Sequence, residues 1–385
     1  MRIVFVGLQG VPYYGRACDP RLANTANLLS NEADVFVLNR YSSLQSHTLT
    51  GITLNASVKS QEIIKRRVSG ALVSKLLFVL SILKEPFSIL SIHKRKHIDI
   101  LHVYSGHYLD FLFYYIISRL IGARVVYQYV EYRTAKPHNP SLYHRVNNYL
   151  CDKHGARLWD GCIAISNYLE QRAKEVNPRL QVIKITPLCD FSLFDVEDNH
   201  IDISDEYVMF CGHAGYFEVL KLVIDAYRTS SIKNTKKLLL VLGGNENQIN
   251  NVHIYAPGAI IRSKIPYNEL VSYYKHAHAL LIPLRDTLED IARFPNKICE
   301  YTAAHGLIVT TNYGEIPYYF MDGENAIVAK ECTSEAIAEK LDSLENGDYN
   351  TDLIKKNSYK TGLSYFSIDA YSKTLPAFLN NLKNQ

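Results

Sequence analysis

The chain of 385 residues is long enough for two globular domains, because single domains usually hold about 100 to 200 residues. Apolar residues make up 47% and charged residues 21%, which is typical of a globular protein and excludes a disordered or fibrous chain. The formal net charge of +4 is small, so no nucleic-acid partner is expected.

The N-terminus and the cysteines indicate a cytoplasmic protein. The opening residues MRIVFVGL predict a strand, because they lack the basic, apolar and small-residue regions of a signal peptide. No window offers the ~20 uninterrupted apolar residues of a membrane-spanning helix. The seven cysteines are scattered and form no C-x-x-C pair, which fits reduced thiols better than disulfides or a zinc site.

The first half of the chain alternates short apolar runs with amphipathic stretches, which predicts a repeat of strands and helices. Strands are expected at Ile3–Val6, Val35–Leu38, Ile100–Tyr104, Arg124–Tyr127, Gly161–Ile165 and Gln181–Ile185. Helices are expected at Pro20–Ser30, Tyr108–Leu120, Tyr143–Leu158 and Asn167–Val176. Residues 1–186 are therefore predicted to form a Rossmann-like domain.

A basic stretch interrupts this first half. From Ser57 to His97 there are nine Lys or Arg residues but only two acids, Glu62 and Glu85, around the apolar segment ALVSKLLFVLSILKEPFSIL. Apolar residues with basic flanks fit an amphipathic segment that lies on an anionic membrane surface. They fit equally a buried helix with a solvated basic rim. The first interpretation predicts a peripheral position on the inner face of the cytoplasmic membrane.

Residues 187–206 are acidic and show little periodicity, so they are predicted to connect two domains. The strand–helix repeat then restarts, with strands expected at Tyr207–Cys211, Leu238–Leu242, Val252–Tyr255, Ala279–Pro283 and Leu307–Thr311. Helices are expected at Glu218–Tyr227, Tyr267–Lys275, Asn296–His305 and Ser334–Leu344. Residues 207–368 would form the second domain, and the helix within 369–385 would cross back to the first.

The predicted fold class is therefore α/β, with two Rossmann-like, doubly wound parallel-sheet domains. In such sheets ligands bind outside the carboxyl ends of the strands. Two sheets in series are expected to face a central cleft that holds the ligand.

The most informative stretch is RFPNKICEY, residues 293–301. Pro295 suits the first turn of a helix, whose free N–H groups can bind an anion. Arg293 and Lys297 add positive charge, which favours a diphosphate. Glu300 lies one turn further along the same face, where its carboxylate can accept hydrogen bonds from a ribose diol. The alternative for Glu300 is a solvated helix residue.

This stretch resembles the retaining glycosyltransferase family 4, of the group 1 type and the GT-B fold. The family pattern is E-G-F-x-x-x-x-x-E, then a helix of small residues, a Gly, an apolar strand and a Gly-Gly or Gly-Glu turn. The matching residues here are Phe294, Pro295, Asn296, Glu300, Gly306, Gly314 and Glu315. Further matches follow the family order at 160–166 (DGCIAIS), at 187–190 (PLCD) with Phe194, and at Pro266, Glu269 and Leu270. The resemblance spans nearly the whole chain.

The first Glu of the family pattern is replaced by Ala292. In the family that carboxylate sits by the donor sugar, so its loss puts donor choice and its catalytic contribution in doubt. Glu289, Asp290 and Asp286 are the candidates to supply the missing charge from the segment before the helix.

A second departure follows the first strand of the second domain. The family has Gly-Arg and then Lys there, which clamp the diphosphate. Here Gly212 is followed by His213 in the Arg position, and Glu218 falls where Lys is usual. Arg293 and Lys297 are then expected to carry the positive charge.

The first domain offers three further candidates. Gly15, in the first strand–helix turn, matches a family glycine whose backbone N–H contacts donor phosphate or acceptor; the alternative is a plain loop glycine. His107 and Glu131 each follow a predicted strand, where acceptor contacts are expected, and could orient or deprotonate an acceptor hydroxyl. Each of these two could also be an ordinary loop residue.

The resemblance implies a hexosyltransferase-type enzyme. The sugar would pass, with retention, from a nucleotide-diphosphate sugar to a saccharide or lipid-linked saccharide in bacterial surface polysaccharide synthesis, such as that of lipopolysaccharide. The acceptor would bind residues 1–186 and the donor residues 207–368. The implied catalytic residues are Glu300, Glu131 and His107, and the implied donor-binding residues are Gly15, Gly212, His213, Arg293, Phe294, Pro295, Asn296, Lys297 and Glu300.

No metal or other cofactor is expected, since the chain contains no Asp-x-Asp and no cluster of Cys and His typical of a metal site. Two alternatives remain. One is another GT-B enzyme, such as a sugar-nucleotide epimerase. The other, motivated by Ala292, is a catalytically silent protein that binds a sugar nucleotide or a glycan.

Overall fold

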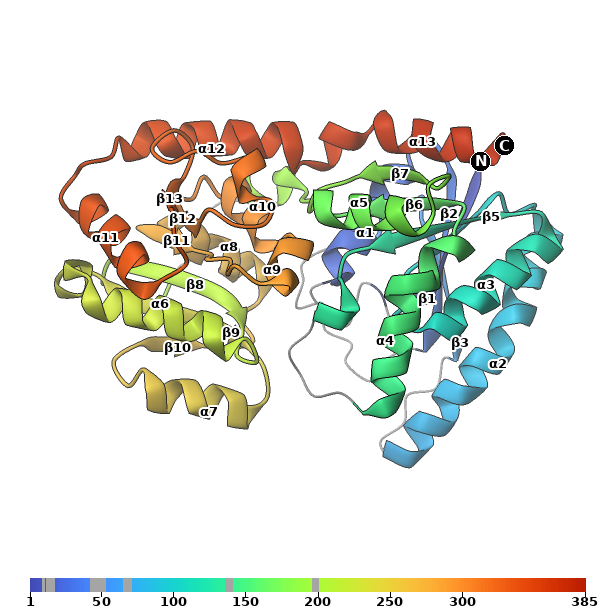
Figure 1. Cartoon of the computed structure of the whole chain (residues 1–385), viewed down its shortest axis with the longest axis horizontal. Helices are drawn as coiled ribbons and strands as arrows, with labels where there is room; N and C mark the ends of the chain where they lie inside the picture. Colours follow the sequence, from blue (N-terminus) through green and yellow to red (C-terminus); the bar gives the residue numbers. More distant parts are fainter. Residues whose placement is uncertain (9–10, 12–17, 42–52, 65–70, 136–140, 196–200) are drawn as a thin grey trace. The chain divides into compact units, whose positions relative to one another are not determined.

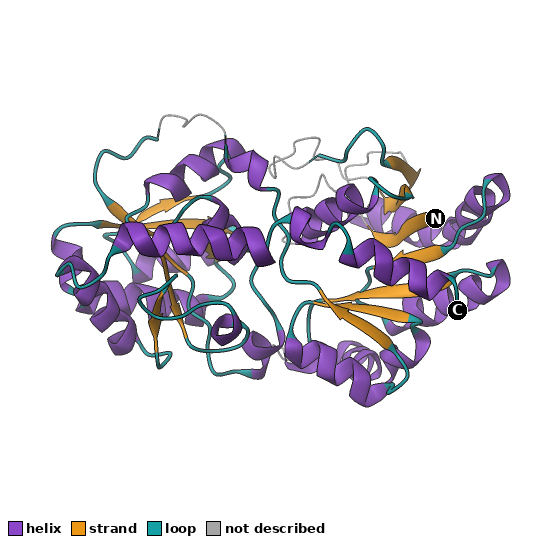
Figure 2. Ribbon diagram, turned by 90° about the horizontal axis from the view of Figure 1, so that it is seen from above, coloured by secondary structure: helices purple, strands orange, loops and turns teal. Residues whose placement is uncertain are grey.

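The computed structural model describes residues 1–8, 11, 18–41, 53–64, 71–135, 141–195 and 201–385 (Figure 1). The chain divides into two compact units. Unit 1 comprises Met1–Leu188 together with Ile368–Gln385, and unit 2 comprises Cys189–Ser367. Each unit is built on its own sheet between helices (Figure 2).

Unit 1 contains a seven-stranded sheet in the order β3-β2-β1-β4-β5-β6-β7, and all its strand pairs are parallel. The strands are β1 Arg2–Leu8, β2 Asp34–Tyr41, β3 Lys59–Ile64, β4 Ile100–Val103, β5 Arg124–Tyr129, β6 Gly161–Ala164 and β7 Gln181–Lys184. The helices are α1 Cys18–Leu29, α2 Ala71–Arg95, α3 Tyr108–Ile121, α4 Leu142–His154, α5 Asn167–Val176 and α13 Thr374–Lys383.

Helix α13 comes from the end of the chain but packs in unit 1. Its residues Leu375, Leu379 and Leu382 are buried in one cluster with the apolar strands of this unit. Gly161 of β6 permits the approach, because a Cβ at that position would collide with the Leu382 side chain. The sheet face beneath α13 is therefore completed by residues far apart in the sequence.

Unit 2 contains a six-stranded parallel sheet in the order β10-β9-β8-β11-β12-β13. The strands are β8 Tyr207–His213, β9 Lys237–Gly243, β10 Ile260–Arg262, β11 Ala279–Leu281, β12 Ile308–Thr311 and β13 Ile327–Ala329. The helices are α6 Phe217–Thr229, α7 Glu246–Tyr255, α8 Tyr267–His276, α9 Leu288–Ala292, α10 Lys297–Ala303, α11 Ser334–Glu345 and α12 Thr351–Tyr365.

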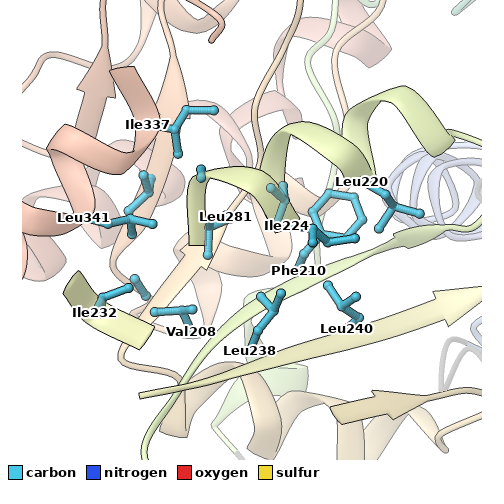
Figure 3. Packing of buried hydrophobic residues seen from close by; sticks show 14 of the residues in the cluster. Val208, Phe210, Leu220, Ile224, Ile232, Leu238, Leu240, Leu281, Ile337 and Leu341 are labelled. Carbon is cyan, nitrogen blue, oxygen red and sulfur yellow. The ribbon is translucent and has the colours of Figure 1, made fainter. Parts of the chain in front are cut away.

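The core of unit 2 forms where α6 and α11 pack against each other and against the sheet (Figure 3). Phe210 and Leu240 of the central strands meet Leu220 and Ile224 of α6, and Leu341 comes from α11. Full burial of each such side chain contributes about 1.5–3 kcal/mol. This packing holds the carboxyl end of β8, where His213 and the following turn lie, in a fixed place.

The fold class is confirmed: the chain forms two doubly wound, parallel-sheet α/β units. The strand predicted at Val252–Tyr255 is wrong, because these residues end helix α7. That helix begins with a capping box, in which the Asn245 side chain accepts from the Gln248 backbone N–H and the Gln248 side chain accepts from the Asn245 backbone N–H. The helical start outweighs the apolar run at the other end.

The sequence pattern did not predict three short strands and one weakly amphipathic helix. Strand β3 reads KSQEII, with two exposed, three half-buried and one buried residue, and four of its six residues are polar, so its apolar signal is weak. Strands β10 and β13 have three residues each, too few to show a period. Helix α12 is weakly amphipathic and was not predicted.

The two chain connections between the units run together. The first passes between Leu188 and Cys189 and the second between Ser367 and Ile368. Cys189 donates its backbone N–H to the Phe366 carbonyl at 2.9 Å and forms a parallel bridge with Ser367. The segment predicted as a connection, 187–206, therefore begins at the first crossing, and residues 189–195 and 201–206 of it belong to unit 2.

Candidate functional site

The carboxyl end of β8 carries the first group of predicted donor-binding residues. Gly212 and His213 are the last two residues of this strand. The exposed His213 side chain accepts a hydrogen bond at Nδ1 from the Gly215 backbone N–H at 3.0 Å. This bond fixes the turn between β8 and α6, at the sheet edge where ligands of doubly wound folds bind.

Glu300 lies buried on α10, with 5% of its surface exposed. Its Oε2 atom accepts from Lys297 Nζ at 2.6 Å and from the Tyr274 hydroxyl of α8 at 3.0 Å. The Lys297 ammonium also lies 5.6 Å from the centre of the Tyr274 ring. Glu300 is therefore not the solvated helix residue of the alternative interpretation.

Two tyrosines tie this pair to β8. The Cys211 backbone N–H donates to the Tyr301 hydroxyl at 3.1 Å, and the Cys211 Sγ lies 3.3 Å from the Tyr274 hydroxyl. Burial acts to lower the pKa of Lys297, but the neighbouring Cys211 and Glu300 outweigh it and raise that pKa above the ordinary lysine value. Lys297 is therefore a fixed cation at the end of β8 at neutral pH.

Arg293 forms a second charged cluster with the carboxylates of α9. Its guanidinium contacts Asp290 at 2.5 Å and Glu289 at 3.6 Å, and it stacks over the Tyr216 ring at 4.6 Å. Arg285 binds the same two carboxylates. Burial opposes the charge on Asp290, but hydrogen bonds from Arg285 and the charge of Arg293 hold its pKa below the usual range.

This cluster bears on which acid could replace the family carboxylate that is missing at Ala292. The Ala292 side chain is completely buried. Of the three acids proposed to replace it, Glu289 and Asp290 are already ion-paired with arginines. Asp286 is exposed in the segment before α9 and is the better candidate.

Phe294, Pro295 and Asn296 link α9 to α10. Phe294 is buried and stacks on Tyr319 with ring centres 5.5 Å apart, so its side chain is committed to packing. Helix α10 begins at Lys297, and Asn296 is its cap. Pro295 therefore precedes the helix and does not occupy its first turn as expected. The backbone carbonyl of Asn296 accepts from the Cys299 thiol at 2.8 Å.

In unit 1, His107 caps the start of α3 just after β4. Its backbone N–H donates to the Ser105 hydroxyl at 3.2 Å, and its Nδ1 lies 3.4 Å from the Tyr143 hydroxyl. Desolvation lowers the pKa of His107; Asp110 opposes this effect and Arg133 reinforces it, and the result lies below the ordinary histidine value. His107 is therefore a neutral imidazole at pH 7, exposed at the sheet edge.

Arg133 is a functional candidate that the sequence pattern missed. It lies two residues beyond the predicted Glu131, after β5, and donates from Nη2 to the Ser105 carbonyl at 2.9 Å. The Tyr127 hydroxyl lies 3.4 Å from the same nitrogen. Among the described residues no carboxylate forms a salt bridge with Arg133; burial acts to lower its pKa, but nearby groups, the charge of Glu131 among them, hold that pKa above the usual value. Its position shortly after a strand was the available signal.

The predicted residues fall into separate groups. Gly212, His213, Arg293 and the Lys297–Glu300 pair gather at the end of β8 in unit 2. His107 and Glu131 lie in unit 1, at the carboxyl ends of neighbouring strands. Gly15 lies outside the described residues.

Residues 194–361 match the family model "Glycosyl transferases group 1". The chain therefore carries a group 1 glycosyltransferase domain, and the two sheets give it the GT-B fold. No curated protein sequence matches the chain.

Solved structures share the fold over the whole chain. Sucrose-phosphate synthase from Thermosynechococcus elongatus is 13% identical with a TM-score of 0.77, and 99% of each chain is covered. HepE from Anabaena, in complex with UDP, is 13% identical with a TM-score of 0.69 and covers 99% of this chain and 100% of its own. A glycosyltransferase from Rickettsia africae is 15% identical with a TM-score of 0.66, covering 100% and 99%.

Proposed function

We propose that the chain is a retaining hexosyltransferase of family 4. It moves a sugar from a nucleotide-diphosphate donor to a saccharide or lipid-linked saccharide in bacterial surface polysaccharide synthesis. The observation that carries this proposal is the buried Lys297–Glu300 pair, held against the end of β8 in the group 1 domain. HepE, which has this fold, is solved with UDP.

Donor binding exchanges the partners of this pair. A ribose diol donates its two O–H groups to Glu300, and Lys297 turns from the carboxylate to a phosphate oxygen. Both new contacts are charge-assisted hydrogen bonds, which are stronger than neutral ones. Once Lys297 and Glu300 hold the bound donor in this way, little further reorganisation is needed as charge develops on the leaving diphosphate. Arg293, above Tyr216, adds further positive charge.

In the proposed reaction Lys297 and Arg293 stabilise the negative charge that develops on the leaving diphosphate, and no divalent metal is required. The sequence holds no Asp-x-Asp, the pair of acids that metal-dependent transferases use to hold the donor's cation. The bond between the anomeric carbon and the diphosphate oxygen breaks, and the acceptor oxygen bonds to the same face of that carbon. This accounts for retention. Positioning of donor and acceptor supplies the rest of the rate enhancement.

The acceptor binds in unit 1, at the edge that holds His107, Glu131 and Arg133. His107 accepts the proton of the acceptor hydroxyl, because its imidazole is neutral. Arg133 binds an anionic group of the acceptor, because its guanidinium keeps donors free of carboxylate partners among the described residues. Glu131 orients the acceptor hydroxyl.

We expect kcat/KM to rise with pH through the pKa of His107 and then to level off. The base works in its neutral form, and its pKa lies below the usual value of about 6.5, so the rise falls on the acid side of that value. His107→Gln should abolish this rise and lower kcat about 100- to 10,000-fold. The exposed His253 of α7 provides the control variant His253→Gln. An unchanged pH profile in His107→Gln would remove His107 from the mechanism.

The proposed place of action is the inner face of the cytoplasmic membrane, where residues 57–97 contact an anionic surface. Helix α2 supports this proposal. From Leu72 to Arg95 it is long and apolar enough, by length and composition, to cross a membrane, with a mean hydropathy of 1.5 over its most apolar window. Only 22% of that window is buried, so most of it does not fit the alternative interpretation of a buried helix.

Thermal unfolding against nucleoside diphosphates and their sugars tests the donor assignment. A ligand at 100 times its Kd should stabilise the protein by about 2.7 kcal/mol, whereas the free nucleoside should not. The donor that stabilises is then incubated with and without saccharide acceptors, in buffer with and without EDTA. Release of nucleoside diphosphate in EDTA supports metal-independent transfer.

The two alternatives give different results in the same assay. An epimerase converts the sugar nucleotide to its isomer without an acceptor. A silent binding protein is stabilised but never turns over, and the buried Ala292 in place of the family carboxylate is the observation in its favour. Absence of stabilisation by every donor would reject the transferase itself.

A further inference from the structure

We propose that helices α2, α3 and α4 of unit 1 form one continuous docking surface for an anionic lipid bilayer, with α2 lying in the plane of the membrane. The inference deepens the proposed membrane association and adds two helices that lie outside residues 57–97. Helix α3 contacts both α2 and α4, and the three helices run side by side in unit 1 (Figure 1).

Helix α2 exposes a stripe of large apolar side chains. Leu72, Leu76, Leu83 and Phe87 recur at intervals of about one or two turns, and their exposed fractions are 84%, 60%, 61% and 71%. The opposite face packs on β2 and β3 and buries Ile89. Helix α2 therefore has an inner face that packs in the unit and an outer face whose large apolar side chains are exposed in the described part of the chain.

The stripe continues over the other two helices. Helix α3 exposes Ile116 at 49% and Leu120 at 74%, four residues apart on one face. Helix α4 exposes Leu142 at 75%, Val146 at 51% and Tyr149 at 53%, with the same helical spacing. Large apolar side chains that are exposed on three neighbouring helices of one unit indicate an interaction site.

The charges of the same helices are sorted by face. Each helix holds a single carboxylate, and all three are buried: Glu85 in α2, Asp110 in α3 and Asp152 in α4. The lysines and arginines of these helices are exposed, although Arg119 pairs with Asp160 at 2.7 Å: Lys75, Lys84, Lys94, Arg95, Arg119, Arg145 and Lys153. The outer surface is thus apolar and cationic with no exposed carboxylate of its own, which complements anionic lipid headgroups.

The buried carboxylates also decide how α2 meets the bilayer. Glu85 lies in the middle of α2 and accepts from Arg40 of β2 at 2.6 Å and from the Tyr114 hydroxyl of α3 at 2.7 Å. A helix that crossed the membrane would have to break these bonds and carry an unpaired carboxylate into the hydrocarbon. Docked by Glu85, α2 instead lies flat and inserts its outer stripe between headgroups.

A second copy of the chain fits this surface poorly. A two-fold interface would place the same cationic side chains of both copies against each other, and like charges repel. The position suits a bilayer that carries the acceptor. Tyr143, which is exposed at the start of α4, lies beside His107 of the acceptor edge.

The test is sedimentation of the full chain with vesicles of phosphatidylcholine that contain or lack phosphatidylglycerol. We expect binding only to the anionic vesicles and its loss at high salt. Two variants lie outside residues 57–97: Leu120→Ser with Ile116→Ser on α3, and Val146→Ser on α4. Each should weaken binding about ten-fold or more, as should Leu83→Ser on α2. Lys84→Glu should weaken it about five-fold or more. The matched controls are Ile254→Ser and Lys356→Glu, exposed residues of unit 2.

Four results would overturn the proposal. Two concern binding: no binding to anionic vesicles, or loss of binding only in the α2 variants. The third is resistance to extraction by alkaline carbonate, which indicates a spanning helix. The fourth is a dimer in sedimentation velocity that these variants abolish. Fluorescence of Trp159, the single tryptophan, which is buried in unit 1, checks that each unit 1 variant is folded, and stabilisation by nucleoside diphosphates is measured on the same samples. The stabilisation separates failure of this surface from failure of the transferase assignment, because the proposed donor residues lie in unit 2.

Discussion

Replacing Glu300 with alanine is expected to weaken nucleotide-sugar binding by one to two orders of magnitude. Hydrogen bonds to a charged partner contribute about 1.5–3 kcal/mol, and the carboxylate is proposed to receive both ribose hydroxyls. The change also leaves Lys297 and the Tyr274 hydroxyl without their shared partner, so the loss includes the cost of an unpaired cation.

A second substitution separates these two contributions. Glu300→Gln keeps an oxygen for Tyr274 and one ribose hydroxyl but removes the charge, so its effect should lie between those of wild type and Glu300→Ala. Donor KM and Kd from thermal stabilisation are the measurements, with circular dichroism to check folding. The exposed Glu269 of α8 supplies the control Glu269→Ala. A donor KM unchanged in both Glu300 variants would refute the ribose assignment.

Replacing Arg40 with methionine is expected to cost unit 1 about 3–5 kcal/mol of unfolding free energy. Arg40 is buried and binds Glu85 at 2.6 Å, Asp110 at 2.8 and 3.0 Å, and the Tyr114 hydroxyl at 2.8 Å. Without the guanidinium, two carboxylates face each other in the interior. One of them must then take up a proton, since neither charge is compensated.

This loss should depend on pH with a definite sign. In Arg40→Met the folded carboxyls have raised pKa values, so the folded state binds more protons than the unfolded state and stability falls as pH rises. The destabilisation should thus be smaller near pH 5 than near pH 8. Denaturation followed by fluorescence of Trp159, the single tryptophan, reports on unit 1, where it is buried against Tyr127.

Further variants give the matched comparison. Arg40→Met combined with Glu85→Met should recover part of the loss, because one buried charge is removed with its partner. The neighbouring exposed Lys84→Met should change stability little. A loss below about 1 kcal/mol in Arg40→Met at pH 8 would contradict the role of this network.

The periodicity of apolar residues was enough to predict the long strands and helices, but it did not predict the ionic contacts. Strands β1, β2, β5, β8 and β9 were predicted because their buried residues form continuous apolar runs, as parallel strands require. The last four residues of α7, Val252–Tyr255, were mistaken for a strand because the helix is weakly amphipathic and its start is encoded in the polar pair Asn245 and Gln248. A capping box read before the apolar pattern would have corrected it.

The site shows the same limit. Lys297 and Glu300 were placed on one helix face by their spacing, and that placement is what allows their contact. Their third partner, Tyr274, lies on a different helix, which spacing within one segment does not reveal. The pairing of Arg293 with Asp290 and Glu289, which neutralises acids proposed to replace the missing family carboxylate, also depends on how α9 folds.

The return of α13 to unit 1 has a consequence for synthesis of the protein. The cluster on one face of the first sheet includes Leu375, Leu379 and Leu382, which are synthesised after all of unit 2. Unit 2, enclosed between the two crossings, is complete in sequence before that point. The part of the first sheet that α13 covers must therefore wait until α13 has been synthesised, while unit 2 can already fold. A truncation that removes α13 would expose the part of the first sheet that this helix covers and would leave every residue of unit 2 in place.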